Sequence, residues 1–379
     1  MTFIKGVGMT KFGIQDDTTS HLVYEATFEA LDDADMSMDD VDAIVLSNHD
    51  FLTNGERQRH SASQISSLFQ KKMPIITIPA ACAGGGTALW TALKFQKSGN
   101  YQNILVIGFD KIVATIGKKI TDEILMAAER IYEQAEGLNF PAQNALVAQQ
   151  YMLRYGATTD DFALVAYKNH QNAFLNPKAR FYNKKVSLEE IKNSPIVASP
   201  LRVFDCSISC NGAAALILSK EKSDIEVVGS GEENDYLSPF EREDMTSLDA
   251  TRLAAEEAYK QAGIAPNDVD MAEVHDAFTP LEIISYEDLE FCEKGEGKNM
   301  IRKGITNING KLPVNTSGGL KAKGHPISPT CISQVYEIVK QMRKEAGDRQ
   351  LDNVNYGLCQ NIGGAGSTVA VHLLKRVSA

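Results

Sequence analysis

The sequence predicts an α/β fold made of two related halves. When the chain is shifted by 228 positions, segment 24–42 falls on segment 252–270. In both segments a helical apolar pattern is followed by a polar turn and a short apolar run. Apolar strands such as 104–107 suit a sheet that helices cover on both faces. The identical pairs include Ala26 with Ala254, Ala30 with Ala258, Val41 with Val269 and Asp42 with Asp270.

The expected elements follow one order in both halves. Each half opens with an apolar strand that carries two glycines, at 4–8 and 227–231, and closes with a strand of small and apolar residues, at 212–218 and 366–371. A repeat this long indicates duplicated domains and not a solenoid of short units. Neither glycine pair completes the GxGxxG fingerprint, so a dinucleotide site is only weakly supported. We expect domains at 1–221 and 222–379.

An insertion at about 111–205 makes the first half longer. It is rich in polar residues and contains Lys168, Lys178, Arg180, Lys184 and Lys185. Two interpretations stay open: the insertion is a solvated lysine-rich surface, or it is a lid that contacts phosphate groups of a substrate.

The composition narrows the class of protein. The 379 residues are 43% hydrophobic and 23% charged, which is ordinary for a globular protein. A net charge of −11 argues against a nucleic-acid partner, and no apolar run approaches the ~18–20 residues that span a membrane. The N-terminus has the pattern of a strand and not of a signal peptide. Six cysteines form no disulfide or zinc-binding pattern, so we expect free thiols, no metal and a cytoplasmic location.

Cys82 is the strongest candidate for a nucleophile. It follows the apolar strand 75–78 and precedes three glycines that open a helix. A thiol at a helix N-terminus lies near unpaired N–H groups and the positive end of the helix dipole. This position predicts a thiolate, which is the reactive form of cysteine.

Three loops of the second half could serve a cysteine nucleophile. Residues 273–278 place His275 at the end of a strand, and His325 lies between Gly324 and Pro326 in a glycine-rich loop before a helix. A loop histidine can remove the proton of the thiol. The third loop, 359–366, can present backbone N–H groups to an oxyanion.

These motifs together resemble the thiolase superfamily over almost the whole chain. The Cys82 loop is similar to the thiolase nucleophile loop, and Gly324-His325-Pro326 matches the Gly-His-Pro motif. His275-Asp276-Ala277-Phe278 takes the place of Asn-Glu-Ala-Phe and resembles the His-Asp-Cys-Phe of sterol-carrier-protein-type thiolases. Segment 211–215 resembles the end of the first half of the family. The likeness is greatest to archaeal thiolases of the mevalonate pathway.

The resemblance implies a five-layer αβαβα fold and coenzyme A thioesters as substrates, with no further cofactor. Cys82 would accept an acetyl group from acetyl-CoA, with His325 as its activating base. A second acetyl-CoA would then attack the acetyl-enzyme to give acetoacetyl-CoA. His275 and His325 would line the enolate hole, and the N–H groups of Cys82 and Gly363 would hold the tetrahedral intermediate.

The resemblance also suggests binding residues and partners. Lys168, Arg180 and Ser317 are the candidates for contacts with coenzyme A. The chain would form a homodimer or homotetramer. It could join a hydroxymethylglutaryl-CoA synthase through a zinc-ribbon/OB-fold scaffold protein.

The sequence departs from the family at the second catalytic cysteine. Alignment on the glycines places Asn361 there, and Ala277 replaces the cysteine of the sterol-carrier-type motif. Cys359 lies two residues earlier, on the same face of a strand, but displaced by ~6–7 Å. The open alternatives are a degradative 3-ketoacyl-CoA or sterol-carrier-type thiolase, a decarboxylating ketosynthase-like enzyme and a non-catalytic subunit of a complex.

Overall fold

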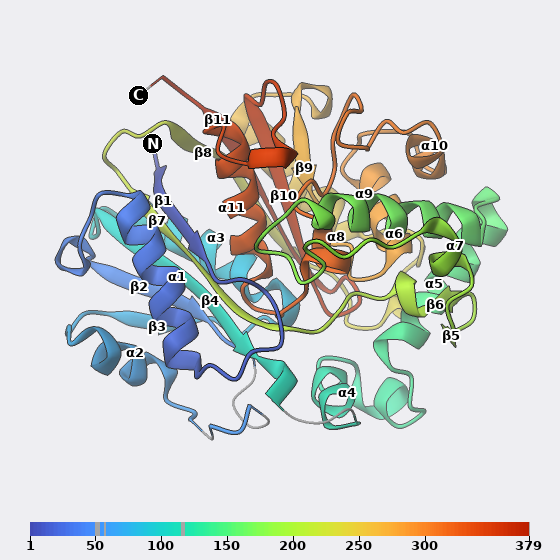
Figure 1. Cartoon of the computed structure of the whole chain (residues 1–379), viewed down its shortest axis with the longest axis horizontal. Helices are drawn as coiled ribbons and strands as arrows, with labels where there is room; N and C mark the ends of the chain where they lie inside the picture. Colours follow the sequence, from blue (N-terminus) through green and yellow to red (C-terminus); the bar gives the residue numbers. More distant parts are fainter. Residues whose placement is uncertain (50–53, 57, 115–117, 379) are drawn as a thin grey trace.

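The computed structural model describes residues 1–49, 54–56, 58–114 and 118–378 (Figure 1). Within these residues nine strands form one sheet, in the order β3-β2-β4-β7-β1-β8-β11-β10-β9. The strands are β1 (Phe3–Met9), β2 (Ala43–Ser47), β3 (Ile75–Thr77), β4 (Asn103–Lys111), β7 (Asn211–Ser219), β8 (Ile225–Asn234), β9 (Met271–Glu273), β10 (Tyr356–Gly363) and β11 (Thr368–Arg376). A separate hairpin contains β5 (Ile196–Ala198) and β6 (Leu201–Arg202).

Helices cover the outer faces of this sheet and fill the space between its two halves. They are α1 (Thr19–Asp33), α2 (Ser61–Phe69), α3 (Gly84–Lys97), α4 (Lys118–Leu125), α5 (Phe140–Tyr155), α6 (Thr159–Phe174), α7 (Leu188–Lys192), α8 (Asp249–Ala262), α9 (Thr279–Asp288), α10 (Gly297–Arg302) and α11 (Thr330–Met342). Two single turns matter for the site: the 3₁₀ turn η2 (Ala81–Ala83) and the π turn η8 (Gly319–Lys323). Among the described helices, none combines the length and the apolar composition that a membrane span requires.

The strand order confirms the predicted duplication. The sequence β1-β7-β4-β2 in the first half is repeated by β8-β11-β10-β9 in the second. The two halves join where β1 pairs antiparallel with β8, through Phe3 with Glu226 and Ile4 with Ile225. Val314 forms a parallel bridge with Ala272, at the position that β3 takes beside β2. The halves are therefore related by an approximate twofold axis between β1 and β8.

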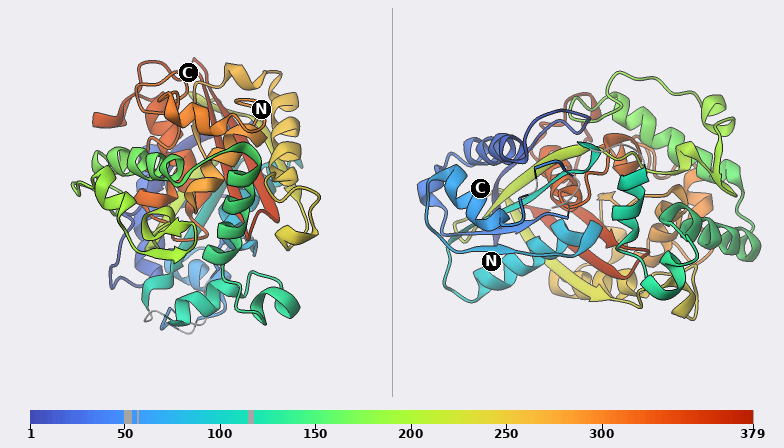
Figure 2. Two further views of the ribbon diagram at one scale, coloured as in Figure 1. Left: turned by 90° about the vertical axis from the view of Figure 1, so that its right-hand side faces the viewer. Right: turned by 90° about the horizontal axis from the view of Figure 1, so that it is seen from below.

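The layers are those of the predicted αβαβα fold. Helix α1 packs on β1 and β7, and α8 packs in the same way on β8 and β11. Helices α3 and α11 lie between the two halves of the sheet and contact strands of both (Figures 1 and 2). Their apolar side chains, including Leu89 and Val335, share one buried cluster with β1, β4 and β10.

The glycine pairs serve helix packing and not a dinucleotide. A Cβ added to Gly6 would lie 2.1 Å from the carbonyl oxygen of Ala30, and one added to Gly229 would lie 2.2 Å from that of Ala258. Gly8 and Gly231 meet Ala26 and Ala254 in the same way. The repeated glycines and alanines thus let each outer helix contact the first strand of its own half directly.

This contact yields a stability prediction. We expect Gly229→Ala to lower the free energy of unfolding by about 1–3 kcal/mol, since the new methyl group would push α8 away from β8. Urea denaturation checks this value. Gly13→Ala is the control, because there the nearest atom to an added Cβ is the flexible Gln15 side chain at 3.0 Å. Equal stability of the two variants would contradict the packing argument.

The insertion of the first half packs against the second half. Helices α5 and α6 contact α9, and α6 also contacts η8 (Figure 1). The backbone N–H of Arg180 donates to the carbonyl of Lys323, and that of Phe181 donates to the carbonyl of Ala322. The insertion therefore holds the segment that leads to His325.

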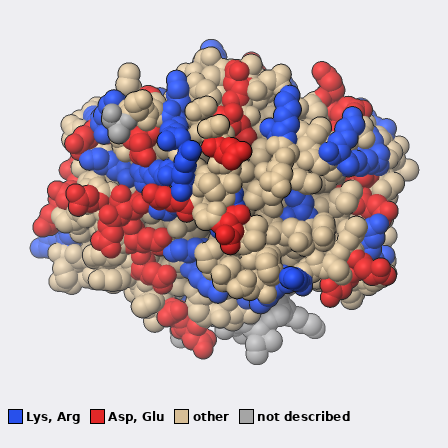
Figure 3. All heavy atoms as spheres, turned by 45° about the horizontal axis from the view of Figure 1, so that its top comes forward, with Lys and Arg blue, Asp and Glu red and all other residues tan. Residues whose placement is uncertain are grey.

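The surface carries both signs of charge. Figure 3 shows acidic and basic side chains distributed over one face, with a group of acidic side chains toward its left side. Lys184 and Lys185 of the insertion are exposed to solvent, whereas Lys178 is paired with Glu29. The interpretation of the insertion as a solvated lysine-rich surface therefore fits Lys184 and Lys185 but not Lys178.

Candidate active site

A strained turn presents Cys82 at the start of α3. The preceding residue, Ala81, has a φ of 46°, which is unusual for a residue other than glycine. Cys82 lies in η2, and α3 begins two residues later at Gly84. A Cβ on Gly85 would lie 2.4 Å from the carbonyl oxygen of Ser328. This glycine therefore lets the start of α3 approach the loop that carries His325.

Cys82 is a neutral thiol in the resting protein, contrary to the thiolate predicted from its helix position. Although the residue is partly exposed, burial raises the pKa of its thiol to about 12, and the Asp110 carboxylate adds to this shift. Asp110 is itself held by the backbone N–H groups of His49 and Ser328, each at 2.8 Å. Desolvation thus outweighs the helix terminus, and Cys82 would need a base to act as a nucleophile.

His325 lies in a loop that its neighbours fix on both sides. Gly324 has a φ of 122°, a conformation that favours glycine. The backbone N–H of His325 donates to the carbonyl of Ile208 at 2.9 Å, and its Nδ1 lies 2.8 Å from the Thr330 hydroxyl. Burial lowers the pKa of the imidazole to about 3. His325 is therefore neutral at physiological pH, the protonation state that a base requires, and the same burial lowers its proton affinity.

His275 follows β9, and its tautomer is defined by the backbone. The N–H of Ile362 donates to Nδ1 at 3.2 Å, so the proton of the neutral ring lies on Nε2. Burial holds the pKa of His275 well below its usual value, with neighbouring His325 as a second cause. The two rings meet edge to face with centroids 5.3 Å apart. The predicted pair of histidines is thus brought together.

Asn361 connects this pair to α3, the helix that follows Cys82. Its side-chain Nδ2 lies 3.2 Å from Nδ1 of His275, and its Oδ1 accepts the N–H of Gly86 at 3.2 Å. Asn361, which the sequence resemblance aligns with the second cysteine of the family, therefore lies beside His275. An amide does not titrate, so it positions its neighbours and transfers no proton.

Gly363 lies directly against the Cys82 turn. An added Cβ would be 3.0 Å from both the carbonyl oxygen of Ala80 and the Cβ of Ala83. The third loop therefore reaches the turn that carries Cys82, as its predicted role in an oxyanion hole requires. The binding of an oxyanion by its N–H stays a prediction.

The fold and the order of these loops agree with comparisons with known proteins. The family model described as thiolase, N-terminal domain, matches residues 2–222, and the one described as thiolase C-terminal domain-like matches 231–376. The chain belongs to the thiolase family. An acetyl-CoA acetyltransferase of Methanothermobacter thermautotrophicus is 39% identical over 382 residues, 98% of each chain. Human sterol carrier protein 2 is 32% identical over 98% of this chain and 71% of its own length.

Solved structures of related fold include different activities. The structure of an Ltp2-ChsH2(DUF35) aldolase has a TM-score of 0.86 and 25% identity, covering 99% of this chain and 97% of the other. An acetyl-CoA acetyltransferase from Syntrophomonas wolfei has a TM-score of 0.76 at 17% identity, covering 99% of both chains. The fold alone therefore leaves the reaction open. The full-length relatives identify this thiolase as an acyltransferase.

Two of the three residues predicted to contact coenzyme A are committed to the interior. The ammonium of Lys168 lies 2.8 Å from the Glu282 carboxylate and donates to the carbonyl of Val314 at 2.6 Å. Ser317 is fully buried, and its hydroxyl donates to Glu273. The polar groups of both side chains are therefore already satisfied inside the fold. Arg180 is half-buried and stays a candidate.

Cys359 lies in the core, and its described contacts do not include the histidine pair. It is fully buried, and its sulfur is 4.0 Å from that of Cys331 in α11. It shares an apolar cluster with Ile332 and Val335. Among its described contacts the structure brings no reacting group to this thiol, so its predicted role with the α-proton is not supported.

Asp110 and Thr330 were not predicted, and Asn361 was predicted only to replace the second cysteine. Asp110, Thr330 and Asn361 act on Cys82, His325 and His275 respectively. Asp110 ends an apolar strand, and Thr330 begins a helix after the Gly-His-Pro loop. A polar residue at the end of an apolar strand or at the start of a helix can indicate a site residue, but the tertiary fold decides which group it contacts.

The lowered pKa of His325 predicts an unusual pH profile. We expect kcat/KM for acyl transfer to stay within about twofold between pH 5.5 and 7.5, because the neutral base is not protonated until about pH 3. Histidines of the unfolded chain take up protons near pH 6.5, so stability falls with pH below that value. Rates are therefore measured where circular dichroism shows an intact fold. An acid limb near pH 6.5 would contradict the lowered pKa.

Proposed function

We propose that this thiolase condenses two molecules of acetyl-CoA to acetoacetyl-CoA and free coenzyme A through an acetyl group on Cys82. The observation that carries the proposal is the pair of neutral histidines in contact, on segments that are linked to the start of the helix after Cys82 through Ser328 and Asn361. The names of the archaeal relatives support the two-carbon substrate.

In the first half-reaction, His325 takes the proton of the Cys82 thiol as the sulfur attacks the acetyl carbonyl. The N–H groups of Cys82 and Gly363 stabilise the oxyanion. The carbon–sulfur bond to coenzyme A then breaks, and the departing thiolate receives the proton from the imidazolium. His325 is neutral again when acetyl-Cys82 has formed.

In the second half-reaction, neutral His325 takes a proton from the methyl group of a second acetyl-CoA. The Nε2–H of His275 donates to the developing enolate oxygen, since the N–H of Ile362 holds the ring in that tautomer. The enolate carbon attacks acetyl-Cys82, and the released thiolate recovers the proton from His325. This scheme needs no second cysteine and leaves the enzyme unchanged.

Substrate preference tests the proposal. The assay measures thiolytic cleavage of acetoacetyl-CoA and of 3-ketooctanoyl-CoA, and condensation with acetyl-CoA or malonyl-CoA as the carbon donor. We expect the highest kcat/KM with acetoacetyl-CoA. Preference for the eight-carbon substrate would indicate a degradative enzyme. Condensation with malonyl-CoA alone would indicate a decarboxylating enzyme, an alternative that the replacement of the second cysteine by Asn361 favours.

We also propose an assembly and a cellular role for this thiolase. Strand β3 lies at the end of the sheet and pairs only with β2 among the described strands, so its free edge could pair with a second copy. The name of the structural relative, Ltp2-ChsH2(DUF35) aldolase, joins two components, which supports a scaffold-bound form of this thiolase. We propose a cytoplasmic homo-oligomer that supplies a hydroxymethylglutaryl-CoA synthase of the mevalonate pathway. Size-exclusion chromatography with light scattering tests the oligomer.

A further inference from the structure

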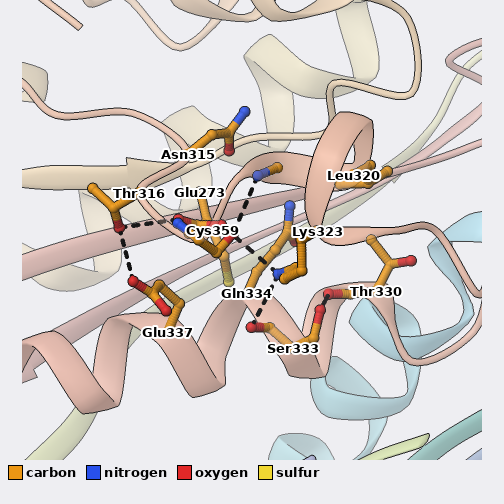
Figure 4. Close-up of polar contacts among 12 residues, drawn as sticks. Glu273, Asn315, Thr316, Leu320, Lys323, Thr330, Ser333, Gln334, Glu337 and Cys359 are labelled. Atoms are coloured by element: carbon orange, nitrogen blue, oxygen red, sulfur yellow. Dashed lines mark hydrogen bonds and ion pairs between the residues drawn. The ribbon is translucent and has the colours of Figure 1, made fainter. Parts of the chain in front are cut away.

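A buried ion pair joins two residues, each of which lies two positions before one of the histidines. Glu273 ends β9 and precedes His275, and Lys323 ends η8 and precedes His325. Both side chains are almost completely inaccessible to solvent, and Nζ of Lys323 lies 3.9 Å from Oε2 of Glu273. Figure 4 shows the two side chains directed toward each other, between η8 and α11.

The carboxylate of Glu273 is also bound to the loop that leads to His325. The backbone N–H of Ser317 donates to Oε1 at 3.0 Å, and the Ser317 hydroxyl donates to Oε2. The Thr316 hydroxyl lies 3.3 Å from Oε1 (Figure 4). The strand that ends near His275 is thereby joined to the segment that begins the other histidine loop.

Lys323 joins the same loop to α11. Its ammonium donates to the carbonyl of Ser333 at 3.3 Å, and the Ser333 hydroxyl donates to the carbonyl of Thr330 at 2.7 Å. Thr330 is the residue whose hydroxyl contacts Nδ1 of His325. The ion pair therefore links the segment of His275 to the segment of His325. Through Ser333, Lys323 is also linked to Thr330, which contacts the His325 ring.

A second buried ion pair lies beside the first. The Arg349 guanidinium lies 2.9 Å from the Glu337 carboxylate, and the Thr316 hydroxyl is 3.1 Å from Glu337. Lys323 and Arg349 thus offset Glu273 and Glu337, while Asp276 also acts on the lysine. Removing Lys323 alone would leave an excess of buried negative charge, which is costly because protein screens it poorly.

We infer that Lys323 and Glu273 are positioning residues that hold the rings of His275 and His325 in the contact required for activation of Cys82. Neither side chain needs to touch a substrate. The catalytic meaning of this inference rests on the proposed function, but the geometry of the histidines and the reactivity of Cys82 can be measured without any coenzyme A thioester.

The test is the rate of Cys82 alkylation by iodoacetamide at pH 6 to 9, resolved by mass spectrometry of the Cys82 peptide. In the wild type, His325 assists ionisation of the thiol. We expect Lys323→Met to lower the rate at pH 7 about tenfold or more, because small displacements of a base are costly. We expect the double variant Lys323→Met with Glu273→Gln, which restores charge balance but not the ion pair between the two histidine segments, to stay about tenfold below wild type. A return to the wild-type rate would show that the single variant acts through an unpaired buried charge and not through lost positioning.

Arg343→Met is the matched control. Arg343 caps the far end of α11 and pairs with Asp33 and Asp224, so its loss removes two partly buried ion pairs away from the histidines. We expect a lower Tm with an unchanged alkylation profile. If folded Lys323→Met also loses Tm but alkylates Cys82 as fast as wild type, the pair is merely structural and the inference is wrong.

Lys323→Arg keeps the test decisive if the methionine variant does not fold. This variant retains the charge, and we expect its alkylation rate to lie below that of wild type but above the tenfold loss predicted for Lys323→Met. A rate equal to that of wild type together with a Tm loss would overturn the positioning role. Because alkylation uses no thioester, a thiolase that lacks acetyl-CoA activity but shows these shifts would refute the proposed function and support the inference.

Discussion

His325→Gln is expected to lower the rate of Cys82 acylation by about 10²–10⁴-fold. A thiol with a pKa of about 12 is ionised in only about one molecule in 10⁵ at pH 7, so the reaction depends on a base. Neutral His325 is the proposed base: its loop packs against the start of α3 at Gly85, and Thr330 contacts its Nδ1. Rapid-quench mass spectrometry of acyl-Cys82 measures the rate.

His170→Leu is a matched control for this variant. His170 is another buried histidine, its pKa is lowered to about 2 by burial, and its two ring nitrogens have no hydrogen-bond partner among the described residues. Its ring packs against Phe181 and Phe204 in the insertion. We expect acylation within about threefold of wild type. If His325→Gln acylates at nearly the wild-type rate, another group removes the thiol proton.

Asn361→Asp is expected to lower the condensation rate by at least about 10²-fold, which is typical for the loss of an oxyanion donor. The new carboxylate would accept a hydrogen bond from a protonated Nδ1 of His275, and so would favour the Nδ1–H tautomer over the one that presents Nε2–H. It would also place a charge in a fully buried position. Acylation of Cys82 should decrease less, since it does not use the enolate hole.

Asn361→Ala separates the two effects. This variant loses the side-chain contacts with His275 and Gly86, but the N–H of Ile362 still donates to Nδ1. The tautomer is kept, so we expect a loss of about tenfold or less. Steady-state condensation and single-turnover acylation are compared for both variants. Equal losses in Asn361→Ala and Asn361→Asp would show that the tautomer of His275 does not matter.

Much of the fold could be predicted because it is encoded locally and twice. The repeat of Ala26 and Ala254 marks two helices in equivalent places, and the glycine pairs mark the strands below them. The sequence alone did not show why the pairs are glycine. That reason is the 2.1–2.2 Å distance from an added Cβ to a helix carbonyl, which appears only when helix and strand are packed.

The site was predictable in its loops but not in its electrostatics. The helix terminus at Cys82 is a local feature and predicts a thiolate, whereas burial and Asp110 come from the tertiary fold and produce a thiol. Lys168 and Ser317 belong to polar segments, and only the packing of α6 and of loop 315–317 on the second half shows that they are internal. Cys359 shares a strand face with Asn361 but points into the α11 core.

Mass spectrometry of the intact protein after brief exposure to acetyl-CoA tests the central claim most directly. We predict an acetyl group on the Cys82 peptide that disappears when free coenzyme A is added, and no adduct in Cys82→Ala. An adduct on another residue, or none on a folded protein with either acetyl-CoA or acetoacetyl-CoA, would contradict a covalent acyl transfer through Cys82.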